Sequence, residues 1–185
     1  MKKLVFCTAF LMAGCVATPI PDSSQTARQY IGLDEYQDRS ELRDLTGVDP
    51  VRTEWCAAFV NAILELDGIP GSASVSDHPL MARSFLDWGV AIERENVKRG
   101  DVIVFPRGNR GWQGHVGFYV GGSPKGNWII LGGNQDNEVS YGIFNPNKAL
   151  GIRRYPINTT SPTRTLWGFN PVDLERQGEN KWEDH

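Results

Sequence analysis

The sequence predicts an α+β fold in a single domain, with N-terminal helices packed on a small antiparallel sheet of about five to six strands. Up to residue 88, apolar residues recur at the spacing of buried helix faces. From Gly100 onward, short apolar or alternating runs are separated by clusters of Gly, Asn and Pro, which is typical of strands and turns. Helices followed by strands indicate the α+β class rather than alternating βαβ units.

The N-terminal 14 residues are expected to be a signal peptide. Lys2 and Lys3 precede an apolar run that is too short to span a bilayer. The segment Leu11-Met12-Ala13-Gly14-Cys15 resembles a bacterial lipobox, which implies lipidation of Cys15 and anchoring on the periplasmic side of the outer membrane. The alternative is ordinary cleavage after residue 17, which would give a soluble periplasmic or secreted protein.

The rest of the chain divides into a tether over residues 15–25, a folded domain over 26–171 and a polar tail over 172–185 that we expect to be disordered. Within the domain we expect helices over 26–36, 40–45, 53–66 and 77–88. The expected strands are 101–105, 115–120, 128–131, 139–144, 150–153 and 165–169. The formal net charge of -3 argues against a nucleic-acid partner.

Cys56 is the candidate nucleophile. It is the one cysteine left in the folded domain if Cys7 leaves with the signal peptide and Cys15 carries lipid. With Thr53 as N-cap, Cys56 would be about the third residue of the helix over 53–66. The helix end would lower the pKa of the thiol, and its N–H groups could receive an oxyanion. The alternative is a small buried side chain of the core.

His115 is the preferred base among three histidines. His185 ends the polar tail and His78 precedes Pro79, so both are interpreted as surface residues. His115 follows a glycine-rich loop and begins a strand, where its ring could face a cleft. A histidine also needs a group that fixes its tautomer, and the segment after residue 131 offers several candidates. Asn134, Gln135 and Asp136 remain open on chemical grounds, and a simple hairpin turn would also explain them.

Four blocks in order resemble the NlpC/P60 superfamily, most closely its CHAP-related branch. They are TEWCAAFV at 53–60, KRGDVIVF at 98–105, GHVGFY at 114–119 and GGNQ at 132–135. The resemblance implies a papain-like fold with Cys56 as nucleophile, His115 as base and Asn134 as the third catalytic residue. It also implies peptidoglycan as the partner. We expect no cofactor and no metal, since no HExxH or CxxC spacing supports a metal site.

The resemblance further implies cleavage of an amide bond of the peptidoglycan stem peptide, by an endopeptidase or an N-acetylmuramoyl-L-alanine amidase. Trp55, Trp112 and Tyr119 could line a substrate groove, although packing in the core or a loop is the more common role of such residues. Two other functions are considered. One is a zinc amidase with Cys56, His78 and His115 as ligands, and the other is a lipoprotein that binds the cell wall without catalysis.

Overall fold

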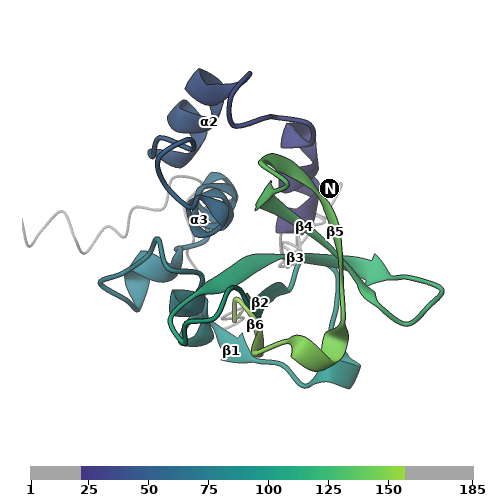
Figure 1. Ribbon diagram of the computed structural model, residues 1–185. Coiled ribbons are helices and arrows are strands. Elements are labelled where there is room, and N and C mark those ends of the chain that lie inside the picture. The colour runs from purple at the N-terminus through teal and green to yellow at the C-terminus, as the bar shows by residue number, and fades with distance from the viewer. Residues whose placement is uncertain (1–21, 157–185) are drawn as a thin grey trace, which may run out of the picture.

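The computed structural model describes residues 22–156, which form three α-helices on one side of a six-stranded antiparallel sheet (Figure 1). The strand order is β1-β6-β2-β3-β4-β5, and every pairing is antiparallel. The α+β prediction is therefore confirmed. The predicted signal peptide, Cys15, the strand over 165–169 and the polar tail all lie outside the described residues.

The α-helices are α1 (Ser23–Ala27), α2 (Arg39–Thr46) and α3 (Cys56–Leu66). Five short 3-10 helices lie between the other elements: Arg28–Tyr30, Ser72–Ser74, Ala82–Leu86, Arg94–Asn96 and Pro146–Lys148. None of the helices among the described residues is long and apolar enough to cross a membrane.

Two expected helices are shorter than their apolar spacing indicated. The helix expected over 26–36 is α1 and one 3-10 turn, because the chain then turns at Gly32, whose φ is 94°. Gly32 donates its N–H to the carbonyl of Val139, and Val139 donates to the carbonyl of Leu33, so this segment joins the edge of the sheet. The helix expected over 77–88 is the 3-10 helix Ala82–Leu86, since Pro79 supplies no N–H and disfavours helical backbone before it.

The strands are β1 (Val90–Ala91), β2 (Val102–Pro106), β3 (Gly114–Gly122), β4 (Trp128–Gln135), β5 (Glu138–Phe144) and β6 (Gly151–Arg154). All five strands expected between residues 101 and 153 are present. The two-residue strand β1 was not expected, because so short a segment has no measurable periodicity.

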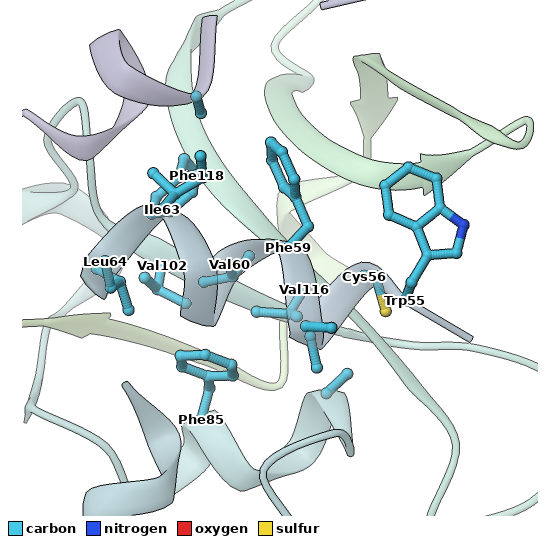
Figure 2. Close-up of a cluster of buried hydrophobic side chains, with 14 of the residues drawn as sticks. Trp55, Cys56, Phe59, Val60, Ile63, Leu64, Phe85, Val102, Val116 and Phe118 are labelled. Atoms are coloured by element: carbon cyan, nitrogen blue, oxygen red, sulfur yellow. The ribbon is translucent and has the colours of Figure 1, made fainter. Parts of the chain in front are cut away.

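The two faces of the sheet carry different cores. On one face α3 packs Phe59, Val60 and Ile63 against side chains of β2 and β3, including Val116 and Phe118 (Figure 2). On the other face a smaller cluster gathers residues of three strands, β2, β4 and β6: Ile103, Phe105, Trp128, Ile130 and Ile152. Neighbouring residues of a strand point to opposite faces, so β2 and β3 each contribute to both cores.

A distortion near the end of β4 brings helix and sheet close together. The register between β4 and β5 shifts between Gly132 and Gln135, and Asn134 adopts a left-handed φ of 56°. A side chain at Gly133 would overlap the ring of Trp55, so glycine is needed where Trp55 packs on the strand. The start of α3 is thereby held against the irregular end of β4.

Candidate active site

Cys56 is the first residue of α3, whereas the sequence predicted about the third position from the N-terminal end of this helix. Trp55 is the N-cap and makes no side-chain capping bond, so Thr53 does not cap this helix. The residue is 3% exposed. The backbone N–H groups of Ala57 and Val116 hydrogen bond to it. Because Val116 directly follows His115, the sulfur lies beside the main chain that carries the candidate base.

The expectation of a lowered thiol pKa is wrong for this structure. Burial raises the pKa of Cys56, and this effect outweighs the hydrogen bonds from Val116 and Ala57 and the charge of Arg107, all of which lower it. The N-terminal end of α3 thus donates a hydrogen bond to the sulfur, but burial away from water favours the neutral thiol.

His115 lies at the start of β3 on the face of the sheet opposite α3. Its ring stacks on Phe144, with centroids 5.4 Å apart and planes at 5°, and its partner in the β2 register is Phe105. The residue is 6% exposed. Burial lowers the pKa of His115 to about 4, with Arg107 acting in the same direction, so the imidazole is neutral at pH 7.

Gln135 fixes the tautomer of that imidazole. Its Oε1 lies 3.1 Å from Nε2 of His115. The amide nitrogen of Gln135 faces the carbonyls of Ile130, Gly132 and Ser140, which can only accept, so Oε1 is the atom turned to the ring. His115 must therefore donate from Nε2–H. Its Nδ1 then carries the lone pair that could take a proton.

The amide of Asn134 does not orient His115, and this corrects the expected contact. Its Nδ2 donates instead to Oε2 of Glu54, at 2.9 Å. The cause is the distortion in β4, because the left-handed backbone at Asn134 breaks the alternation of side chains and turns Gln135 toward the ring. Asp136 lies in the exposed turn that follows, also with a left-handed φ.

A cavity of about 230 Å³ opens beside the thiol. Its lining consists of Glu54, Cys56, Leu80, Met81, Ala82, Arg107, Trp112, Gln113 and Gly114. Trp112 is 57% exposed, which fits its expected place in a substrate groove. Nη1 of Arg107 and Oε2 of Glu54 form an ion pair at 2.8 Å within this lining.

Trp55 and Tyr119 are not placed in the groove where they were expected. Trp55 is fully buried, donates from Nε1 to Oε2 of Glu35 at 3.1 Å and packs edge-on against Phe59. Tyr119 packs against Trp128 in the core on the second face. Both aromatic rings are taken up by packing, so Trp112 alone of the three expected residues lines the cavity.

Within residues 22–156, no three His, Cys, Asp or Glu side chains are gathered so that they could hold a metal ion. Glu54 and Arg107 are the residues of the site that the motifs did not single out. Their place in the sequence could have indicated them. Glu54 lies two residues before Cys56, and Arg107 begins the loop that leads to His115.

Similarity to known proteins is found in structure and not in sequence. No protein-family model matches the chain, and no curated protein matches it in sequence. A crystal structure of an NlpC/P60 family protein from Bacillus cereus is similar, with a TM-score of 0.46 and 22% identity over 74% of this chain and 41% of that one. The structure of NlpC1 from Trichomonas vaginalis gives a TM-score of 0.45 and 22% identity over 72% and 42% of the two chains. The chain thus spans less than half of either protein.

Proposed function

We propose that this protein is a cysteine hydrolase that cleaves an amide bond in the stem peptide of peptidoglycan. The observation that carries the proposal is that the thiol lies beside the main chain that carries the candidate base. The sulfur of Cys56 is held by the N–H next to His115, and Gln135 leaves Nδ1 of His115 able to accept a proton. Membership of the NlpC/P60 superfamily, and of its CHAP-related branch, is part of the proposal and rests on the four sequence blocks.

In the proposed reaction, Sγ of Cys56 attacks the carbonyl carbon while its proton passes to Nδ1 of His115. The backbone N–H of Cys56, in the first turn of α3, is the candidate donor to the oxyanion. The amine leaves with the proton from His115, and water then hydrolyses the thioester with His115 again as base. Since burial favours the neutral forms of both groups, the reaction starts from a neutral thiol and a neutral imidazole.

The products of peptidoglycan digestion test this proposal. Purified protein is incubated with sacculi, and the released fragments are identified by mass spectrometry. Fragments cut within the stem peptide indicate an endopeptidase, whereas intact stem peptides indicate an N-acetylmuramoyl-L-alanine amidase. We expect Cys56→Ser and His115→Ala each to abolish release. Wild-type rates in Cys56→Ser would refute the thiol mechanism.

Two other outcomes would identify the alternative functions. Activity that a chelator removes but iodoacetamide spares would indicate a zinc amidase. Binding to sacculi with no fragment released by the wild type would indicate a non-catalytic cell-wall protein. The near-complete burial of Cys56 and His115 is the observation that favours this second alternative.

We also propose that Cys15 carries lipid and holds the protein at the periplasmic side of the outer membrane. This rests on the lipobox-like segment at residues 11–15. Labelling with palmitate in a bacterial host, with and without Cys15→Ser, tests it. Label that is lost in the variant supports the anchor, and an unlabelled wild type supports a soluble periplasmic or secreted protein.

A further inference from the structure

Arg107 is a cation in the wall of the cavity that the proposed chemistry does not use. It follows β2 and lines the cavity together with Cys56. Its charge reaches both reacting groups, since it lowers the pKa of Cys56 and that of His115. A cation that disfavours the imidazolium hinders a base that must take up a proton. The position of Arg107 therefore favours a negative charge in the cavity rather than proton transfer to His115.

The partner of Arg107 is a carboxylate that can be displaced. The side chain of Glu54 is 74% exposed and that of Arg107 is 42% exposed, so their ion pair is open to solvent. Such exposed pairs add little to the stability of a protein. Glu54 also accepts from Nδ2 of Asn134, which keeps its carboxylate at the rim of the cavity. Glu54 thus takes the place beside the guanidinium that a ligand carboxylate would take. It is bound there only weakly.

The rest of the cavity wall suits the body of a peptide. Leu80, Met81 and Trp112 line it, and Leu80 and Trp112 are about half exposed, at 45% and 57%. A ligand with an aliphatic portion and one carboxylate would contact this apolar wall and meet Arg107 at the same time. A guanidinium can bind a carboxylate through two parallel hydrogen bonds, which fixes orientation as well as charge.

We infer that Arg107 binds a free carboxylate of the substrate, which displaces Glu54, and that the protein thereby selects acidic peptides over their amidated forms. This inference rests on the proposed function, because the cavity is that of the candidate active site. Arg107 is then a specificity-determining residue. The ligand class is a short peptide with a free carboxylate close to the bond that is cleaved.

Binding of two matched peptides to the Cys56→Ala protein tests the inference without turnover. The probes are a synthetic stem peptide with a free carboxylate on its second residue and the same peptide with that group as a carboxamide. Isothermal titration gives both dissociation constants. We expect the carboxylate form to bind at least tenfold more tightly. Adding Arg107→Gln should reduce this ratio below threefold, and adding Arg107→Lys should give an intermediate ratio.

Two further variants separate recognition from a structural role. Arg110→Gln removes a cation of the same loop that does not line the cavity, and it should leave the ratio unchanged. Glu54→Gln removes the internal competitor and should raise the ratio about two- to fivefold. An ion pair that merely stabilised the loop would make Glu54→Gln and Arg107→Gln change the ratio in the same direction.

The inference is overturned if the two peptides bind equally, if neither binds at millimolar concentration, or if Arg107→Gln weakens both to the same extent. The last result would assign Arg107 to general charge stabilisation. Failure of the proposed function is distinguishable, because it appears as absent release from sacculi. A tenfold ratio that depends on Arg107 would still establish the carboxylate site in a protein that cleaves nothing.

Discussion

The two faces of the sheet differ in how they are covered, and the candidate site uses both. The first face is packed under α3 and carries Cys56 at the start of that helix. The buried members of the second core all come from strands, and His115 lies on that face with Phe144 and Gln135. The two side chains therefore belong to opposite faces of the sheet, and their main chains meet at the start of β3. The face under α3 thus contributes most to the stability of the fold, whereas the second face mainly positions His115.

The largest expected effect is on stability, at the first face. Phe59→Ala should lower the free energy of unfolding by about 3 to 5 kcal/mol, because a fully buried ring is replaced by a cavity. Phe144→Ala, which removes a partly exposed ring from the second face, should cost less than half as much. Urea unfolding of both variants measures the difference. Equal losses would contradict the division between the faces.

The next effect is on activity, at the second face. Gln135→Leu removes the acceptor for Nε2–H of His115 and should lower kcat/KM for peptide release by about a hundredfold, since the imidazole loses its fixed tautomer. Asn134→Ala is the matched variant, and it should cost several-fold less because its amide contacts Glu54. Thermal unfolding checks that both variants fold. A larger loss for Asn134→Ala would restore Asn134 as the orienting residue.

A third effect follows from the burial of His115. Its pKa falls from 6.5 to about 4 on folding, so the unfolded chain binds more protons between these values. The stability that the neutral ring supplies is present above pH 6.5 and is lost as the pH falls toward 4, by about 3 kcal/mol at most. His115→Gln should remove this part of the acid sensitivity. The unfolding midpoints of both proteins at pH 7 and pH 4.5 measure this acid sensitivity. If the midpoint changes equally in the two proteins, His115 is exposed to solvent.

The smallest effect concerns Asp136, in the turn beyond β4. Because its φ is 56°, Asp136→Ala should be about 1 kcal/mol less stable than Asp136→Gly, which adopts this backbone without strain. Neither substitution should change peptide release by more than about twofold, since Asp136 is exposed and Gln135 is the residue that contacts the ring. A large loss of release in both variants would make Asp136 the residue that orients His115.

The elements of the fold were predictable wherever periodicity extended over several residues. The apolar face of α3 and the apolar or alternating runs of β2 to β6 are such cases. The shortened helices before Gly32 and after Pro79 were missed, because a backbone turn and a proline override the apolar spacing. The two-residue strand β1 is too short to produce a pattern.

For the site, sequence reasoning placed Cys56 at a helix start and His115 at a strand start, and the structure brings their main chains together. The choice of Gln135 over Asn134 could not be made, because it depends on the irregular backbone of β4. The pKa of Cys56 was misjudged because burial is a property of the whole fold, whereas the helix end is local. Arg107 and Glu54 were missed because their pairing joins segments far apart in the chain.

The measurement that most directly tests whether Cys56 and His115 act together is the rate of alkylation of Cys56 by iodoacetamide at pH 7, followed by mass spectrometry of the peptide that contains this residue. If Nδ1 of His115 accepts the thiol proton, His115→Ala should slow labelling at least tenfold, while His78→Ala, which removes an exposed histidine, should leave it unchanged. Equal rates in the wild type and His115→Ala would contradict the proposed pair.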